Sequence, residues 1–220
     1  MNCDFAVKIN AAMTVDGKIA TVSGDSKISS RQDLKRVHEL RSSVDAIMVG
    51  ISTVLGENPM LSVRLSKKGG INPVRIIIDS TARIPLTSRI LRSAHNNITI
   101  VAVTTRASVN KIKKIQKKGA MVLVAGRRYV DLRKVFFTVQ NIGIQRVLVE
   151  GGGELNWSVL RQGLIAELIV TIAPVIAGGR NATTLVEGEG YRRISKAIKL
   201  NLVKVSRQRT GEVVLYYRFV

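Results

Sequence analysis

The sequence predicts a single α/β domain with a mainly parallel central sheet, helices on both faces and an antiparallel C-terminal hairpin. Short apolar runs alternate with helix-like segments along most of the 220 residues. Several runs, such as Arg75–Asp79 and Val147–Val149, are apolar without strict alternation, which is typical of parallel strands covered on both faces. The last two runs have no helix between them and are joined by a Thr210-Gly211 turn, which predicts an antiparallel hairpin.

The expected strands and helices follow from these runs and from their boundary residues. The strands are expected at 5–11, 45–50, 74–79, 98–104, 121–125, 146–150, 167–173, 199–207 and 212–220. The helices are expected at 30–41, 52–55, 109–118, 132–141 and 154–161. Ser108 and Asp131 stand at N-cap positions, and Gly119 and Gly143 fall just past helix ends.

The amino-acid composition indicates a globular protein. The chain is 45% hydrophobic and 23% charged, which is the balance of a globular protein with a sizeable core rather than a disordered chain. No linker-like segment and no repeat divides it, so we expect one domain over residues 1–220.

Several function classes are excluded by residue counts. Cys3 is the only cysteine, which excludes an intrachain disulfide framework and a multi-cysteine zinc site. The two histidines, His38 and His95, stand in no metal or triad motif, so we expect no metal. No apolar run approaches the ~20 residues of a membrane span, and the N-terminus lacks the pattern of a signal peptide. We therefore expect a cytoplasmic protein without a membrane partner.

The net charge of 35 − 15 = +20 points to anionic ligands. It also raises the alternative of a nucleic-acid-binding protein. Five lysines fall in one predicted helix, where Val109, Ile112 and Ile115 would form the buried side; they are Lys111, Lys113, Lys114, Lys117 and Lys118. Aromatic residues make up only 4% and no recognition motif is present, so we expect no specific nucleic-acid partner.

The most informative segment is Val147–Asn156, where a predicted strand ends at Glu150 and three glycines lead into a helix. Glycines at this place permit positive φ and let a ligand approach the backbone. The N-terminus of the helix offers free N–H groups to a phosphate. A tight strand–helix turn explains one or two glycines, whereas three in a row favour a ligand. The spacing is not GxGxxG, because position 156 is Asn.

Three further polar segments follow predicted strands. Val49–Arg64 leads into a short helix carrying Ser52 and Thr53 and ends with an arginine suited to phosphate. Ile78–Arg83 places the hydroxyls of Ser80 and Thr81 in a polar turn. Asn10–Ile19 opens into an Asp16-Gly17 turn. Each segment is weak alone, and each has a structural explanation as a capped helix or a surface turn.

Taken in order, these motifs resemble the riboflavin-biosynthesis reductase family, whose fold is similar to that of dihydrofolate reductase. The matching stretches are Val15–Ala20, Ser23–Ser26, Leu40-Arg41, Thr53–Arg64, Ile78–Ser80 and Glu150–Gly152. The resemblance covers nearly the whole chain. One departure is Glu57, which stands where the family has aspartate. A zinc deaminase domain needs an H-x-E and paired cysteines, which are absent here, so the chain resembles the stand-alone archaeal or fungal type.

The resemblance implies NADPH-dependent reduction of the ribosylamino side chain of a phosphorylated pyrimidine, with hydride transfer to C1′ of the ring-opened imine. NADH is the alternative cofactor. The implied cofactor residues are Thr53, Glu57, Ser80, Thr81, Arg83, Gly151, Gly152, Gly153, Glu154 and Leu155. The implied substrate residues are Ser26, Arg41, Leu61, Arg64 and Glu150. Asp16 is a proton source, an orienting group or a plain turn residue.

Two further expectations attach to this family. A cation near the ribose 2′-phosphate would select NADPH, and the candidates are Arg83, Arg106, Arg127 and Arg128. Relatives are typically dimers, so we expect a homodimer. The alternatives are a reductase of the deaminated pyrimidine, a dihydrofolate-type reductase and, outside the enzymes, a basic nucleic-acid-binding protein that uses the fold as a scaffold.

Overall fold

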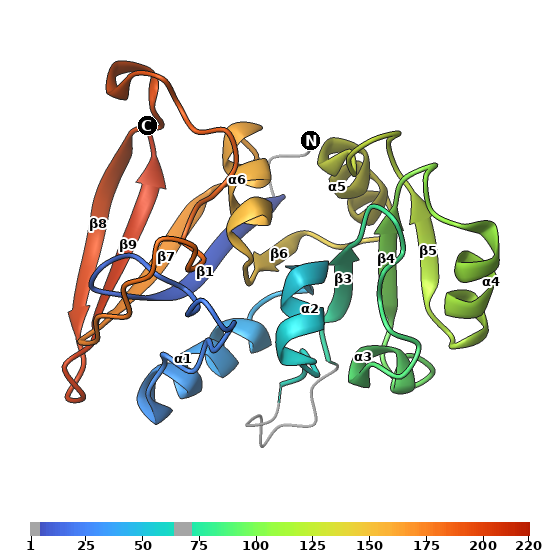
Figure 1. Cartoon of the computed structure of the whole chain (residues 1–220), viewed down its shortest axis with the longest axis horizontal. Helices are drawn as coiled ribbons and strands as arrows, with labels where there is room; N and C mark the ends of the chain where they lie inside the picture. Colours follow the sequence, from blue (N-terminus) through green and yellow to red (C-terminus); the bar gives the residue numbers. More distant parts are fainter. Residues whose placement is uncertain (1–4, 64–71) are drawn as a thin grey trace. The chain divides into compact units, whose positions relative to one another are not determined.

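A computed structural model of the chain describes residues 5–63 and 72–220 (Figure 1). The chain divides into two compact units, and each is described by itself. The first comprises Met1–Phe5 and His38–Leu148, and the second comprises Ala6–Val37 and Val149–Val220. One boundary falls inside helix α1 (Arg31–Ser42).

The strands of the first unit lie in the order β5-β4-β3-β2-β6. Their bounds are Ala46–Gly50 for β2, Val74–Ile78 for β3, Thr99–Val103 for β4, Met121–Val124 for β5 and Arg146–Val149 for β6. The pairs β2–β3, β3–β4 and β4–β5 are parallel. Because neighbouring parallel strands end at the same edge, the loops after β3, β4 and β5 share that edge of the sheet.

Apolar side chains on both faces of this sheet are buried, and every residue of β4 is buried. One face packs Ile47, Ile77 and Val101 against helices α2 (Ile51–Glu57), α3 (Arg89–Arg92) and α4 (Val109–Lys117). Helix α5 (Leu132–Asn141) buries a separate apolar face that includes Phe136. The near-continuous apolar strands are therefore explained by cover on both sides.

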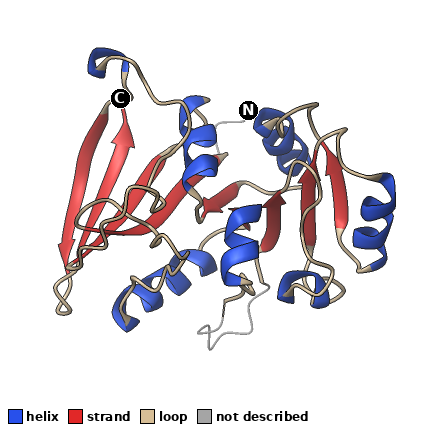
Figure 2. Cartoon of the chain, in the orientation of Figure 1, coloured by secondary structure: helices blue, strands red, loops and turns tan. Residues whose placement is uncertain are grey.

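The strands of the second unit lie in the order β1-β7-β9-β8. They are β1 (Ala6–Thr14), β7 (Glu167–Ala173), β8 (Leu200–Arg207) and β9 (Val213–Phe219). β1 pairs with β7 in parallel, and an ion pair of 2.8 Å joins Lys8 to its register partner Glu167. β9 pairs with β7 and with β8 in antiparallel fashion, as expected for the C-terminal hairpin. The second unit also contains helix α6 (Gly153–Arg161). Figure 2 colours the helices blue and the strands red.

The predicted α/β class, with a mostly parallel sheet and antiparallel C-terminal strands, is confirmed. Each predicted strand is present, with ends that coincide with the predicted ones or differ from them by one to three residues. The largest shift is in β1, which continues to Thr14 because its partner β7 supplies a full parallel register. Two short elements were not predicted, α3 and the 3₁₀ turn Ile194–Lys196. Four and three residues are too few to show a helical period.

One detail of the expected α4 packing is wrong. Ile115 is buried and Ile112 is half-buried, but Val109 is 65% exposed. Val109 is the first residue of the helix, so it lies beyond the surface that the sheet covers. No helix within residues 5–63 and 72–220 is long and apolar enough to span a membrane.

Candidate functional site

The loop after β3 is shaped by a buried carboxylate. Asp79 is fully buried, and its Oδ2 accepts a hydrogen bond from the backbone amide of Ile84 at 2.8 Å. Its carbonyl accepts from the amide of Ala82 at 3.1 Å, and Ala82 has a positive φ of 57°. Backbone strain of this kind is maintained only where surrounding contacts fix it. The loop therefore presents Ser80, Thr81 and Arg83 in one defined conformation.

The loops after β4 and β5 are tied to the loop after β3. Thr104 donates from its amide and its hydroxyl to the carbonyl of Ser80, at 3.0 and 2.7 Å. The amide of Thr105 donates to the carbonyl of Gly126 at 3.1 Å. These bonds hold the three loops together along one edge of the first unit.

This edge carries the predicted 2′-phosphate candidates. Arg83, Arg106 and Arg127 are exposed, and in the part of the chain that the structure describes their side chains have no hydrogen bond or ion pair. Arg128 differs, since its guanidinium lies over the ring of Tyr129 at 5.4 Å. The edge thus offers exposed guanidinium groups beside two half-buried hydroxyls, a combination suited to phosphate groups.

Helix α2 carries the next two predicted residues. It begins directly after β2, with Gly50 as N-cap, and extends to Glu57, two residues beyond the predicted end. Thr53 is half-buried, whereas Glu57 is exposed on the last turn. A carboxylate at a helix C-terminus is unfavourable with respect to the helix dipole, so local helix stability does not account for Glu57.

The segment after α2 carries the predicted substrate residue Leu61. Leu61 is buried, with 3% of its surface exposed, and has a positive φ of 51°. Arg41 approaches this segment, with Nη1 at 3.5 Å from the carbonyl oxygen of Ser62. The predicted residue Arg64 lies outside the described residues. Leu61 and Arg41 are therefore brought to one place in the first unit.

In the second unit, Asp16 is held by its own hydrogen bonds. Its carboxylate accepts from Thr14 Oγ1 at 2.6 Å and from the amides of Ala177 and Gly178 at 3.1 and 2.7 Å. The Thr14 hydroxyl and these amides lower the pKa of Asp16 from 3.8 to about 2. The carboxylate is ionised at neutral pH and carries no proton to donate. These hydrogen bonds join the Asp16-Gly17 turn to the 177–178 loop, and the orienting role and the plain turn role both stay predictions.

The three consecutive glycines at the start of α6 lie in different surroundings. Gly151 has a φ of 95°, and a Cβ placed there would meet no atom within 4 Å. Gly152, the N-cap of α6, has a φ of 71°. Gly153 is packed, because a Cβ there would lie 2.6 Å from Glu187 Cγ and from the carbonyl oxygen of Thr184. Open space therefore lies beside Gly151. At Gly153, by contrast, a glycine is required because Thr184 and Glu187 pack closely against its backbone.

The residues that flank this turn differ in exposure. Glu154 is exposed in the first turn of α6, where a negative charge is favourable. The Leu155 side chain is buried, so only its backbone is placed to meet a ligand. Glu150 is half-buried directly after β6.

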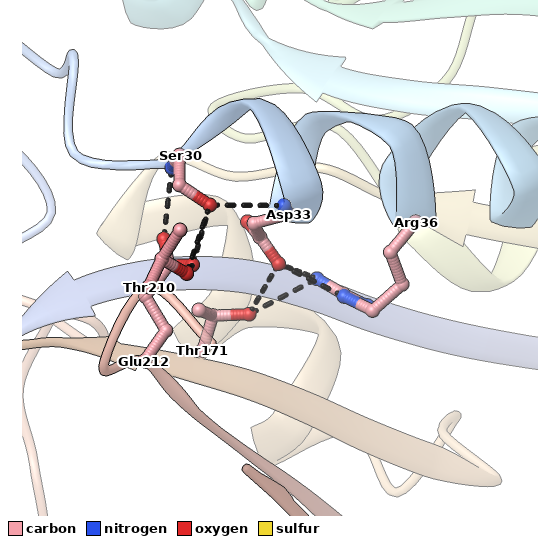
Figure 3. A network of polar contacts seen from close by, with 6 residues as sticks. All are labelled: Ser30, Asp33, Arg36, Thr171, Thr210 and Glu212. Carbon is pink, nitrogen blue, oxygen red and sulfur yellow. Dashed lines mark hydrogen bonds and ion pairs between the residues drawn. The ribbon is translucent and has the colours of Figure 1, made fainter. Parts of the chain in front are cut away.

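The half-buried residue Ser26 precedes helix α1, whose start is fastened by a polar network (Figure 3). Ser30 bonds to Glu212, and one turn later Asp33 Oδ1 accepts from Thr171 Oγ1 at 2.8 Å. Arg36 forms a 2.8 Å ion pair with the same Asp33 carboxylate and donates to Thr171 Oγ1 at 3.0 Å. The network fixes the start of α1, four residues after Ser26, to the strands of the second unit.

Sequence reasoning missed the buried charged residues that support these loops, namely Asp33, Arg75, Asp79 and Glu212. A signal was present for Arg75 and Asp79, because each stands within or directly after the apolar run of β3. A charged residue in a run that is otherwise buried indicates a partnered group. Asp33 and Glu212 stand in polar surroundings of the sequence and gave no such signal.

Comparison with known proteins adds to this geometry. A family model described as the RibD C-terminal domain matches residues 6–216. A protein of Methanothermobacter thermautotrophicus named 2,5-diamino-6-ribosylamino-4(3H)-pyrimidinone 5′-phosphate reductase is 48% identical over 197 residues, 89% of this chain and 90% of that protein. An Aquifex aeolicus protein of the same name is 39% identical over 201 residues, 89% of this chain and 88% of that protein.

Solved structures give the same result for the fold. RibD of Acinetobacter baumannii matches with a TM-score of 0.84 at 25% identity, covering 98% of this chain and 58% of that chain. The chain therefore spans little more than half of that RibD chain. The Saccharomyces cerevisiae riboflavin biosynthesis reductase Rib7 matches with a TM-score of 0.76 at 22% identity, covering 100% of this chain and 92% of that chain.

Proposed function

Because the chain belongs to the family of the RibD C-terminal domain, we propose that it is a 2,5-diamino-6-ribosylamino-4(3H)-pyrimidinone 5′-phosphate reductase. The chain is an oxidoreductase of riboflavin biosynthesis that reduces the ribosylamino side chain to the ribityl form. The observation that carries the proposal is the 48% identity to a protein of that name, over about nine-tenths of both chains. The family match runs through both units, so we treat residues 1–220 as one reductase domain.

We propose NADPH as the cofactor, with NADH as the weaker alternative. When bound, the reduced nicotinamide supplies the hydride. In the first unit, the residues assigned to it are Thr53, Glu57, Ser80, Thr81 and Arg83. In the second unit, they are Gly151, Gly152, Gly153, Glu154 and Leu155. The open space beside Gly151 and the exposed arginines after β3, β4 and β5 support a phosphorylated cofactor.

The substrate phosphate and sugar are assigned to Ser26, Arg41, Leu61, Arg64 and Glu150. The arginines suit a phosphate because guanidinium groups bind its oxygens in bidentate fashion. Asp16 is assigned an orienting role, since its pKa of about 2 leaves it ionised. These residues bind and orient the substrate, while the hydride chemistry belongs to the cofactor.

The test is a conversion assay with both forms of the pyrimidine. The purified chain is incubated with NADPH and either the diamino substrate or its deaminated counterpart. The masses of the products are then measured by mass spectrometry. We expect a gain of two hydrogens on the diamino form. A gain only on the deaminated form would show that the chain reduces the pyrimidine after its deamination. Turnover of dihydrofolate instead would identify a dihydrofolate-type reductase.

We also propose that the chain is located in the cytoplasm. We further propose that it forms a homodimer through β8. β8 is the last strand in the sheet order, and Leu202, Val203 and Val205 on it are at least 50% exposed. An apolar edge strand of this kind is usually paired or covered. Sedimentation velocity of the wild type and of Val203→Lys tests this, since the charged variant should sediment as a monomer. A wild-type monomer would contradict the proposal.

The non-enzyme alternative, a basic nucleic-acid-binding protein, makes a separate prediction. It requires oligonucleotide binding with a steep salt dependence and no saturable NADPH binding. NADPH titration followed by fluorescence decides between the two, because saturable binding of the dinucleotide contradicts the alternative.

A further inference from the structure

Arg75 is a buried arginine at the second position of the apolar strand β3, with 1% of its surface exposed. Among residues 5–63 and 72–220, the groups that accept hydrogen bonds from its guanidinium are neutral, and none is a carboxylate. Nε donates to Thr99 Oγ1 at 3.1 Å, and Nη2 donates to the carbonyls of Ile90 and Asn97 at 3.1 and 3.0 Å. Nη1 donates to Ser93 Oγ at 2.8 Å and to the carbonyl of Met60 at 3.3 Å.

The contact to Met60 reaches the 58–63 segment, which is strained at two places. Asn58 has φ 44° and ψ 53° directly before Pro59, a position that favours extended backbone. Leu61 has φ 51° and is buried. A left-handed conformation is unfavourable for a residue such as leucine and persists only where neighbouring groups hold it. The 58–63 segment therefore needs fastening to keep this shape.

Within the residues that the structure describes, four contacts made by side chains hold this segment, in addition to the Asn58 amide, which donates to the Val54 carbonyl at 3.1 Å. Asn58 Oδ1 accepts from the amide of Arg89 at 2.8 Å, and Asn72 Oδ1 accepts from the amide of Val63 at 3.2 Å. Arg41 lies 3.5 Å from the Ser62 carbonyl. Arg75 holds Met60, the residue directly before Leu61, and it is the buried member of the set.

Stability alone gives no reason for an arginine at this position. Removing a cation from water costs free energy, and an apolar side chain of similar volume in the same strand avoids that cost. Burial lowers the pKa of Arg75 to about 10, so it remains charged at neutral pH despite this cost. What the guanidinium adds, and an apolar side chain cannot, is a rigid fork that joins the Met60 carbonyl to α3 and β4.

We propose that Arg75 is a positioning residue for substrate binding: it fixes the Met60 carbonyl and thereby holds Leu61 in the conformation that the substrate requires. The inference rests on the proposed function, in which Leu61, whose side chain is buried, meets the substrate through its backbone. Arg75 itself touches neither substrate nor cofactor. Its loss affects the 58–63 segment and leaves α2, which is anchored separately through buried Ile51 and Val54, in place.

Kinetics of Arg75→Met and Arg75→Lys test the proposal. We expect the KM for the pyrimidine substrate to rise by about tenfold or more in Arg75→Met, because small displacements of binding groups weaken productive binding. The KM for NADPH should stay within about twofold. Arg75→Lys keeps the positive charge but lacks the forked guanidinium, so its substrate KM should lie between that of the wild type and that of Arg75→Met. A substrate KM within twofold of the wild type in folded Arg75→Met overturns the proposal.

Val139→Ala is the matched control, because it removes buried volume from α5 outside the apolar cluster that contains Leu61. All variants are assayed below the melting temperature of the least stable one. The control should lose stability without any change in substrate KM. An equal rise in substrate KM in Val139→Ala would show that destabilisation alone produces the effect, which also overturns the proposal.

Hydrogen exchange followed by mass spectrometry separates this inference from the proposed function. In Arg75→Met, the hydrogen-bonded amides of this segment, those of Asn58 and Val63, should exchange at least about tenfold faster than in the wild type, whereas α5 amides should not. Unchanged exchange at these amides overturns the positioning role even if the wild type is an active reductase. An inactive wild type with faster exchange in Arg75→Met would instead refute the proposed function and leave the fastening of the 58–63 segment standing.

Discussion

The carboxylate of Glu212 accepts a hydrogen bond from the backbone amide of Ser30 at 2.8 Å, although the two residues are 182 positions apart. The Ser30 hydroxyl donates to the same carboxylate, and Thr210 Oγ1 does so at 2.7 Å (Figure 3). Ser30 Oγ also accepts from the amide of Asp33 at 3.1 Å, as an N-cap does. The turn of the C-terminal hairpin therefore fixes the start of α1.

Glu212→Ala should lower the free energy of unfolding by about 1–3 kcal/mol, because Glu212 is buried and its removal leaves the Ser30 and Thr210 donors without their acceptor. Urea unfolding of the variant and the wild type measures the loss. Glu189→Ala is the control, since Glu189 is 82% exposed in its 3.3 Å pair with Arg161. The control should cost about 0–1 kcal/mol. Equal losses in the two variants would contradict the fastening role of Glu212.

Asp16 should make stability depend on pH in the acid range. Its folded pKa of about 2 lies below the ordinary value of 3.8. Its contribution is therefore present above about pH 4 and is lost as the pH falls towards 2. Urea unfolding of the wild type and Asp16→Asn between pH 2 and 6 should show a difference above pH 4 that shrinks in acid. A constant difference would contradict the hydrogen-bonded carboxylate.

Substitutions of Gly151 and Gly153 should separate ligand binding from packing. Gly151→Ala places a methyl group in open space at a φ of 95°, so we expect backbone strain of about 1–2 kcal/mol and weaker NADPH binding. Gly153→Ala meets the Thr184 carbonyl and Glu187 at 2.6 Å, so overpacking should cost about 1–3 kcal/mol. Thermal melts and NADPH titrations measure both effects. Wild-type NADPH affinity in Gly151→Ala would contradict the assignment of this turn to the cofactor.

Arg106 should contribute to discrimination between NADPH and NADH. It is exposed in the loop after β4, which is bonded to the loops on either side. We expect Arg106→Ala to raise the KM for NADPH by about tenfold, the size of a lost charge-assisted contact, and to leave the KM for NADH unchanged. Arg128→Ala is the control, because that guanidinium lies over Tyr129. Equal effects on both cofactors would exclude a 2′-phosphate contact.

The sequence was sufficient to predict the strands of this fold, because strands such as β3 and β4 are buried on both faces and read as short apolar runs. It also placed the polar loops directly after those strands, where Ser80, Thr81 and Gly151 are found. Both results depend on local patterns. The four-residue helix α3 has too short a pattern, and it was not predicted.

Contacts between distant segments were beyond local patterns. The pairs Asp33–Thr171 and Ser30–Glu212 join residues that are 138 and 182 positions apart, and neither side of either pair shows its partner in the sequence. The same holds for Asp16, whose low pKa depends on the amides of Ala177 and Gly178. The electrostatic state of a residue such as Asp16 could therefore not be predicted from the sequence.

The most direct test of the central claim follows the hydride itself. The chain is incubated with the diamino pyrimidine phosphate and NADPH carrying deuterium at C4 of the nicotinamide, each stereoisomer in turn, and the product is examined by mass spectrometry and NMR. We predict that one of the two stereoisomers delivers a single deuterium to C1′ of the ribityl side chain. Product without deuterium from either isomer, or no product while NADPH is bound, would contradict the account.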